Sequence, residues 1–236
     1  MPPGDRTLHL DAESGPAALA AVAERAIGVL EAGGTVIVPT DTVYGVAAHP
    51  EHAAGLDQLF ALKDRDRSKA MAVLAADADQ ALGLFAMEAL AGEVAAAVTA
   101  MASTTWPGGL TVVGPRSDRW RHVELGGDAT TIGVRVPDSV VVRTIAARVG
   151  PIVTTSANRS GDPTPTDADA AARSLLDDVG LVVDAGPCGG LASTVVDVTV
   201  TPFRIVRRGA VDPAILRIDP RLLAADPAAT VGANRE

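Results

Sequence analysis

Four cationic side chains, Lys63, Arg65, Arg67 and Lys69, fall within a stretch of seven residues. A guanidinium group offers a fork of N–H donors and an ammonium group offers a compact positive charge, so the two types together suit phosphate groups. A run of this kind more often forms a solvated charged face. Because this one lies between two predicted core elements, we interpret it as a candidate phosphate site.

Residues 154–166, TTSANRSGDPTPT, supply six hydroxyl side chains and one amide side chain. The Gly-Asp-Pro triplet within this segment is typical of a turn and needs no further explanation. Thr154, Thr155 and Ser156, in contrast, lie at the end of a predicted strand. Hydroxyls and backbone N–H groups in that position are what a phosphate or a ribose would require.

Residues 35–46, TVIVPTDTVYGV, begin with an apolar, β-branched run that predicts a buried strand. After Pro39, the side chains of Thr40, Asp41 and Thr42 place two hydroxyls and a carboxylate at the end of that strand. Ligands of open α/β sheets bind beyond the carboxyl ends of the strands. A polar turn without function is the alternative, and the other polar segments favour a site.

Arg135 lies within a second predicted strand, TTIGVRVP, at residues 130–137. The two-residue period of a strand places Gly133 and Arg135 on the face opposite Ile132 and Val134. Gly133 leaves open space on that face, which would suit a carboxylate ligand of the arginine. Simple exposure of Arg135 to solvent is the alternative.

Several common site patterns are missing from the chain. It has no G-x-G-x-x-G after a predicted strand, no G-x-x-x-x-G-K-[ST] and no G-x-S-x-G, which argues against a Rossmann domain, a P-loop and a serine hydrolase. The four histidines lack metal-ligand spacing, so we expect no metal site made of protein side chains. Cys188 has no His or Lys beside it in sequence, so we expect no reactive thiol.

The composition fits one folded domain with a substantial core, since the 236 residues are 47% hydrophobic and 21% charged. No apolar run approaches the ~18 residues of a membrane span. The N-terminus lacks the pattern of a signal peptide and the single cysteine suits a reducing compartment, so we expect a cytoplasmic protein without membrane association. The net charge of −9 argues against a general nucleic-acid coat, although a local basic patch remains open.

The elements that must position these side chains alternate between helix and strand, which favours an α/β fold with a mixed sheet. Pro16 opens a helix that Gly33 ends. Further helices are expected at 56–62, within 77–102, after an N-cap at Asp138, and from Asp167 to Leu176. Further strands are expected at 70–76, 105–114, 151–156, 181–186, 193–200 and 203–209. The chain would thus form one domain over residues 1–210, followed by a C-terminal helix and tail over 211–236.

The chain resembles the YrdC family in seven segments that occur in the same order, namely PTDTVYG (39–45), KDR (63–65), WPGGLT (106–111), VRVP (134–137), TTSANRSGDPTPT (154–166), ASTVVD (192–197) and RRG (207–209). The resemblance extends over residues 17–210. It implies an open, twisted, mixed α/β sheet with flanking helices around a large basic cavity. It also implies the short form of the family, without the additional C-terminal domain of longer members.

Characterised YrdC-family members are threonylcarbamoyl-AMP synthases. The resemblance therefore implies a nucleotidyltransferase that forms threonylcarbamoyl-AMP and pyrophosphate from L-threonine, bicarbonate and ATP, with Mg²⁺ accompanying the ATP. The expected onward partner is a transferase complex that modifies an adenosine beside the tRNA anticodon.

The family's site residues carry over to matching positions of this sequence. The Lys-x-Arg and Ser-x-Asn signature, implied to be catalytic, corresponds to Lys63, Arg65, Ser156 and Asn158. The positions expected to contact threonine are Thr42, Arg135, Thr154 and Ser193. The positions expected to contact the nucleotide are Arg65, Lys69, Thr111, Ser156, Thr164 and Arg207.

The chain departs from the family pattern at Asp66, where proline is usual, at Leu74, where some relatives have histidine, and at Ala192, where glutamate is common. Asp66 and Ala192 alter the expected charge of the site and therefore bear on the choice of substrate. Two other functions stay open beside the synthase. One is a module that binds tRNA or double-stranded RNA, and the other is a paralogue that uses a different carbamoyl or nucleotide substrate.

Overall fold

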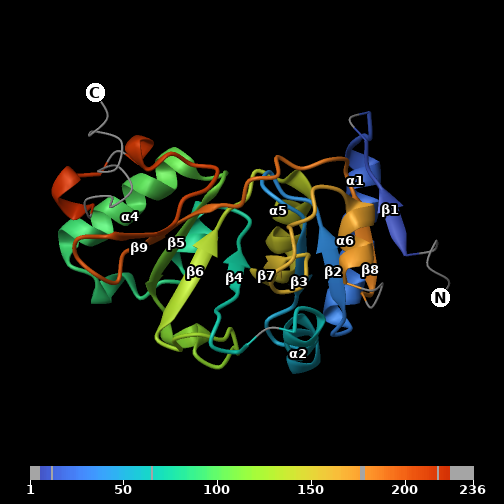
Figure 1. Ribbon diagram of the computed structural model, residues 1–236, viewed down its shortest axis with the longest axis horizontal. Helices are drawn as coiled ribbons and strands as arrows, with labels where there is room; N and C mark the ends of the chain where they lie inside the picture. The colour runs from blue at the N-terminus through green and yellow to red at the C-terminus, as the bar shows by residue number, and fades with distance from the viewer. Residues whose placement is uncertain (1–5, 12, 65, 176–178, 217, 224–236) are drawn as a thin grey trace.

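Ten strands of the described chain form a single mixed sheet with helices on both of its faces (Figure 1). The structure is a computed structural model that describes residues 6–11, 13–64, 66–175, 179–216 and 218–223. Across the sheet the strands run in the order β1-β8-β2-β3-β7-β4-β6-β5-β9-β10. This is the open mixed α/β sheet with flanking helices that the sequence predicts.

The strands are short. Their bounds are β1 Thr7–His9, β2 Thr35–Val38, β3 Gly45–Ala48, β4 Ala72–Leu74, β5 Leu110–Pro115, β6 Thr131–Arg135, β7 Ile152–Ser156, β8 Leu181–Asp184, β9 Thr194–Asp197 and β10 Arg204–Arg207. The α-helices are α1 Pro16–Glu31, α2 Ala53–Leu62, α3 Ala78–Leu82, α4 Gly92–Thr105, α5 Val140–Val149 and α6 Ala168–Ser174. Short 3₁₀ turns occur at Met87–Ala89, Asp118–Trp120, Pro213–Ile215 and Pro220–Leu222.

Strands that are distant in the sequence pair with one another at several places in the sheet. Strand β8 lies parallel to both β1 and β2, and β9 lies parallel to β5. At the centre, β4 runs parallel to β6 and antiparallel to β7. The register places Ala72 beside both Gly133 and Thr154, and it places Leu74 beside Arg135.

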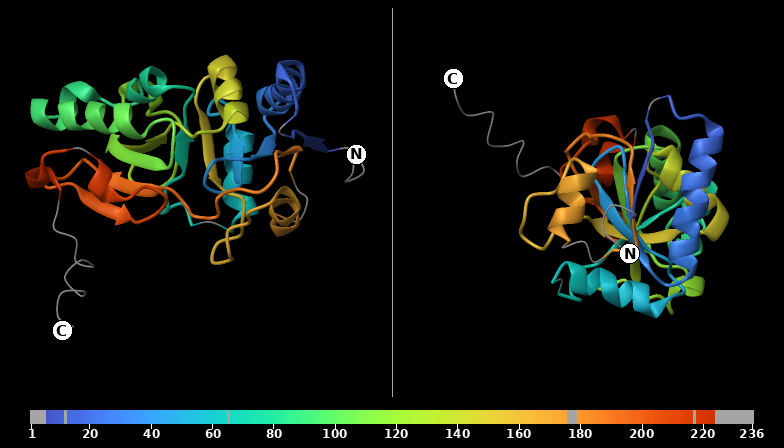
Figure 2. Two further views of the ribbon diagram at one scale, coloured as in Figure 1. Left: turned by 90° about the horizontal axis from the view of Figure 1, so that it is seen from above. Right: turned by 90° about the vertical axis from the view of Figure 1, so that its right-hand side faces the viewer.

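The helices bury apolar stripes against the sheet. Figure 2 shows α1, α4 and α5 along one face of the sheet and α6 on the opposite face. One core cluster, which includes the fully buried Leu30 and Ile145, joins α1 and α5 to the strands at the β2 end. A larger cluster, which includes Leu59 and Met101, extends from α2 to α4. Among the described residues, no helix combines the length and apolar character that a membrane crossing requires.

The predicted helix boundaries are mostly confirmed, with one correction. Helix α5 is capped by Ser139 and not by Asp138, because the Ser139 hydroxyl accepts the N–H of Val142 at 3.4 Å. The backbone N–H of Asp138 instead donates to the carboxylate of Asp41 at 3.0 Å. Helix α6 begins after the predicted cap, Asp167, and runs to Ser174; its predicted end at Leu176 lies outside the described residues.

Two strands, β1 and β3, are absent from the sequence prediction, and the segment after residue 210 differs from it. Two 3₁₀ turns replace the expected helix within residues 211–223. Val211, Leu216 and Leu222 nevertheless pack into the larger core cluster. The expected tail over 224–236 lies outside the described residues, and the division of the chain at residue 210 stays a prediction.

Candidate active site

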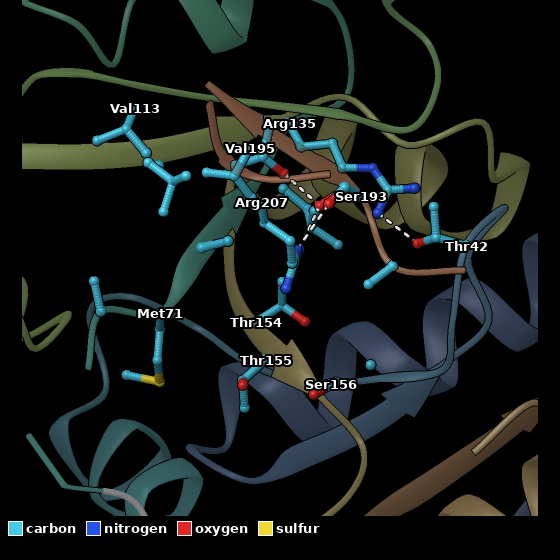
Figure 3. A pocket seen from close by; sticks show the side chains of 18 of the residues that line it. Thr42, Met71, Val113, Arg135, Thr154, Thr155, Ser156, Ser193, Val195 and Arg207 are labelled. Atoms are coloured by element: carbon cyan, nitrogen blue, oxygen red, sulfur yellow. Dashed lines mark hydrogen bonds between the residues drawn. The ribbon is translucent and has the colours of Figure 1, made fainter. Parts of the chain in front are cut away.

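A cavity of about 370 Å³ lies on the sheet face formed by β4, β5, β6 and β7, with β9 and β10 beside it (Figure 3). Eight of the residues predicted for the site line it: Thr42, Thr111, Arg135, Thr154, Ser156, Thr164, Ser193 and Arg207. These eight come from segments spread over most of the chain, and the strand pairing brings them together.

Small side chains on neighbouring strands form the floor of the cavity. Ala72 and Gly133 lie side by side in the register, and Thr154 follows on the next strand. A Cβ atom at Gly133 would lie 3.6 Å from the Thr111 methyl group and 3.7 Å from a methyl group of Val113, which is ordinary contact distance. Gly133 therefore leaves room over the floor, as the sequence predicts.

Arg135 lies buried in the cavity wall, with an exposed fraction of 6%. The alternative interpretation, that Arg135 is simply exposed to solvent, is therefore wrong. Its Nε donates to the carbonyl of Gly108 at 2.9 Å, and its Nη1 donates to the Thr42 hydroxyl at 2.7 Å. Its Nη2 forms an ion pair with the Asp41 carboxylate. Burial lowers the pKa of Arg135, and the charge of Asp41 offsets part of that shift.

A second arginine, Arg207, reaches the cavity from β10. Its Nε donates to the carbonyl oxygen of Ser193 and its Nη2 donates to the Ser193 hydroxyl, both at 2.9 Å. The same hydroxyl lies 2.8 Å from the hydroxyl of Thr111 on β5. Burial lowers the pKa of Arg207. Arg135 and Arg207 are the charged side chains among the described lining residues, and Asp41 balances the charge of Arg135 from outside that lining.

The end of β7 contributes a row of hydroxyls, as the sequence predicts. Thr154, Thr155 and Ser156 all line the cavity, and Figure 3 shows them along one edge of it. The Thr154 hydroxyl donates to the carbonyl of Val46 at 3.1 Å. The Ser156 hydroxyl donates to the Oδ1 of Asn158 at 2.6 Å, so its proton is engaged within the loop.

Lys63 and Asn158 lie behind this wall and not at its surface. The Lys63 ammonium is within 3.1 Å of four oxygen atoms, namely the carbonyl and side-chain oxygens of Ser156 and of Asn158. Lys63 is 2% exposed. The amide nitrogen of Asn158 extends the network by donating to the carbonyl of Asp162 at 2.7 Å. In this arrangement Lys63 ties the loop that carries Ser156 to the end of α2.

Arg67 and Lys69, from the same 63–69 run, are exposed, whereas Lys63 is buried. Arg67 stacks over the ring of Phe60 and forms an ion pair with the exposed Asp57, so at this position the solvated face is the correct interpretation. Lys69 is exposed and is not one of the described residues that line the cavity. Arg65 lies outside the described residues.

The apolar part of the cavity lining is missing from the sequence prediction. Its larger side chains are Val43, Met71, Leu74, Val113, Leu125, Ile132, Val195 and Val206. Strand alternation is the signal that could have identified several of them, since Leu74 and Val113 share a sheet face with Arg135 and Gly133. Leu74 appeared only as a departure from the family pattern.

No metal-ligand group is present in the part of the chain that the structure describes, because no three His, Cys, Asp or Glu side chains converge there. Cys188 is half-buried, and burial raises the pKa of its thiol, so it is a poor nucleophile. It lines a second cavity, of about 480 Å³, together with Thr40, Asp41 and Asp138.

Residues 28–209 match the sequence profile of the Sua5, YciO and YrdC proteins, a family that carries the description "Telomere recombination". The chain belongs to this family. Among Sua5/YciO/YrdC relatives, a protein of Mycobacterium tuberculosis (strain ATCC 25618 / H37Rv) is 36% identical over 190 residues, which is 79% of this chain and 83% of its own. The threonylcarbamoyl-AMP synthase of Stenotrophomonas maltophilia (strain K279a) is 33% identical over 80% of this chain and 95% of its own.

Solved structures of the Sua5/YciO/YrdC family have the same fold. Sua5 of Pyrococcus abyssi complexed with L-threonine superimposes with a TM-score of 0.73 and is 29% identical, over 86% of this chain and 57% of its own. YciO of Escherichia coli superimposes with a TM-score of 0.76 over 88% of this chain and 97% of its own, and at 20% identity it supports the fold alone.

Proposed function

We propose that this chain is an L-threonylcarbamoyladenylate synthase, which forms threonylcarbamoyl-AMP and pyrophosphate from L-threonine, bicarbonate and ATP. The observation that carries the proposal is the single cavity in which all four expected threonine contacts meet four of the six expected nucleotide contacts. The relatives named threonylcarbamoyl-AMP synthase and the Sua5 structure complexed with L-threonine support it.

The proposed reaction needs no protein nucleophile. Bicarbonate takes up a proton and loses water to give CO₂. The threonine amine attacks the CO₂ and loses a proton, which gives a carbamate. A carbamate oxygen then attacks the α-phosphorus of ATP, and the bond to the leaving pyrophosphate breaks. The cavity has to align the two reactants, and such alignment is worth up to ~7–11 kcal/mol in favourable cases.

In this proposal, some lining residues contact threonine and the others contact the nucleotide. Arg135 would bind the threonine carboxylate, and Thr42, Thr154 and Ser193 are its neighbours around the same wall. Arg207 would neutralise charge on the phosphates, where fixed donors stabilise the transition state. Thr111, Ser156 and Thr164 supply hydroxyls to the nucleotide, and Arg65 and Lys69 remain proposed phosphate ligands.

Magnesium would enter as the ATP complex. The described residues offer no converging group of three metal ligands, so phosphate oxygens would have to hold the ion. When bound, it would reduce the negative charge of the phosphates. The proposal also includes a downstream tRNA-modifying transferase and, because the lone cysteine fits a reducing environment, a cytoplasmic reaction.

The test is pyrophosphate release by the purified protein, with threonine and bicarbonate each omitted in turn. We expect release to require both co-substrates and the nucleotide product to have the mass of threonylcarbamoyl-AMP. Arg207→Ala should slow turnover by about 100-fold, because a phosphate-facing donor is lost. Arg204→Ala is the matched control, since Arg204 lies on the same strand but is exposed and paired with Asp197.

Release without threonine, or no release at all, would contradict the synthase proposal and favour a paralogue that uses another carbamoyl or nucleotide substrate. Binding of double-stranded RNA with a steep salt dependence, in the absence of turnover, would favour the RNA-binding alternative. Equal activity of the Arg204 and Arg207 variants would remove Arg207 from the site.

A further inference from the structure

Asp41 contacts Arg135, the arginine that lines the main cavity. Its carboxylate forms the ion pair with the Nη2 of Arg135, and the same oxygen accepts the N–H of Asp138 at 3.0 Å. Asp41 lines the second cavity together with Cys188 and is not among the described residues that line the main one. The ion pair with Arg135 is therefore the contact that links Asp41 to the main cavity.

The contacts of Arg135 leave a defined set of donors for a ligand. A guanidinium group carries five N–H donors. Three of the five are engaged, by the carbonyl of Gly108, the hydroxyl of Thr42 and the carboxylate of Asp41. Among the described residues, no further partner contacts the other two N–H groups, one on each terminal nitrogen. Two such donors on one guanidinium match the two oxygens of a carboxylate.

The three engaged contacts come from two separate segments, so the plane of the guanidinium is fixed before a ligand arrives. Gly108 lies in the loop before β5, and Thr42 and Asp41 lie in the loop between β2 and β3. Asp41 contributes the only charge among the three partners. Without it, a guanidinium with a 7% exposed side chain would lack a counter-charge and would be drawn toward solvent.

We propose that Asp41 is a positioning residue that orients Arg135 for the carboxylate of the amino-acid substrate. The inference rests on the proposed function, which supplies the amino acid. In this role Asp41 would favour substrates that carry a carboxylate over those that do not. It would not strengthen the binding of all substrates equally. The effect should therefore be seen with L-threonine and not with L-threoninamide, which keeps the amine and the hydroxyl but lacks the carboxylate.

The experiment is calorimetric titration of the purified full chain with each of these two compounds. The wild type should prefer L-threonine by at least about tenfold, the size expected when a hydrogen-bonded charge is lost. Asp41→Ala should bring the two affinities close together by weakening L-threonine binding alone. Asp41→Glu should restore much of the preference. A general loss of structure would weaken both compounds and would not be rescued in this way.

Asp138→Ala is the matched control, because it removes a neighbouring exposed carboxylate but keeps the backbone N–H that contacts Asp41. It should retain the wild-type preference. If Asp41→Ala does not fold, Asp41→Asn keeps the shape and an acceptor oxygen, and its preference for L-threonine should fall several-fold.

An unchanged preference in Asp41→Ala or Asp41→Asn would overturn the inference, and so would an equal loss of affinity for both compounds. Failure of the proposed function would look different. In that case the wild type would bind neither compound and would release no pyrophosphate in response to threonine.

Discussion

Two buried cations, Lys63 and Arg135, are stabilised in different ways. The Lys63 ammonium is surrounded by four carbonyl and side-chain oxygens, whereas Arg135 has a carboxylate partner as well as two neutral acceptors. A buried charge is tolerated only when such partners satisfy it. Lys63 thus holds the segment that carries Ser156 and Asn158, whereas Arg135 lines the cavity itself.

Replacing Lys63 by alanine should therefore affect stability as well as activity. Lys63→Ala leaves the buried oxygens of Ser156 and Asn158 without their charged donor, and we expect the free energy of unfolding to fall by about 2–3 kcal/mol. Urea denaturation measures this change. Arg67→Ala is the control from the same run, and its exposed ion pair should be worth less than ~1 kcal/mol. Equal effects of the two variants would contradict the role given to Lys63.

For single residues, the sequence shows which side chains could bind a ligand, but it does not always show which way they point. Thr42, Arg135, Thr154 and Ser193 line one cavity as expected, because strand ends and strand alternation determine where such side chains point. The spacing of the 63–69 run carries no comparable information. It lies at the end of a helix and in the loop that follows, so Lys63 turns into the protein while Arg67 turns outward.

At the scale of the elements, strand β6 provides both the arginine and the space in front of it. Gly133→Ala should fold well, because the new methyl group meets its neighbours at ordinary contact distance. Removing a glycine from a strand should raise stability by up to ~1 kcal/mol. The same methyl group occupies the floor of the cavity, so kcat/KM for pyrophosphate release should fall by about tenfold or more.

Gly114→Ala, on the adjacent strand β5, is the comparison for that prediction. A Cβ atom there would lie 2.8 Å from a ring carbon of Phe85, and Gly114 is not among the described lining residues. It should cost about 1–3 kcal/mol of stability through overpacking. Denaturation and turnover measured on both variants separate the two effects. A loss of stability in Gly133→Ala with unchanged turnover would show that the floor is not where the substrates bind.

The sequence does not predict β1, β3 or the cap of α5, because what determines them is contact with residues distant in the chain. Strand β3 is only Gly45–Ala48, and glycine and alanine have low strand propensity. Its hydrogen bonds come from β2 on one side and β7 on the other. Strand β1 similarly depends on β8, which lies near the other end of the chain. The cap of α5 is missed because Asp138 and Ser139 are both good capping residues, and the contact of Asp138 with Asp41 is invisible in the sequence.

In the whole molecule, the sheet links the N-terminal and C-terminal parts of the chain, since β8 pairs with β1 and β2 and β9 pairs with β5. We therefore expect one cooperative unfolding transition. Leu30→Ala, in the core at the β2 end, should lower the free energy of unfolding by about 2–5 kcal/mol. Of the two tryptophans, Trp106 belongs to the other core cluster and Trp120 packs against it.

The measurement compares tryptophan fluorescence with far-UV circular dichroism in urea. The two transitions should coincide in the wild type and shift together in Leu30→Ala. A fluorescence midpoint that stays at the wild-type value, while circular dichroism shows an earlier loss of structure, would mean that the two ends of the sheet unfold independently.

The wall between the two cavities also has a practical consequence. Cys188 is the single cysteine of the chain, and it lines the second cavity beside Asp41, not the main cavity. An environment-sensitive fluorophore on this thiol would sense changes at the Asp41–Arg135 pair without entering the main cavity. Because burial raises the pKa of the thiol, labelling should proceed faster in alkaline buffer. The fluorescence of this label, placed in the second cavity, could then report whether a ligand occupies the main cavity.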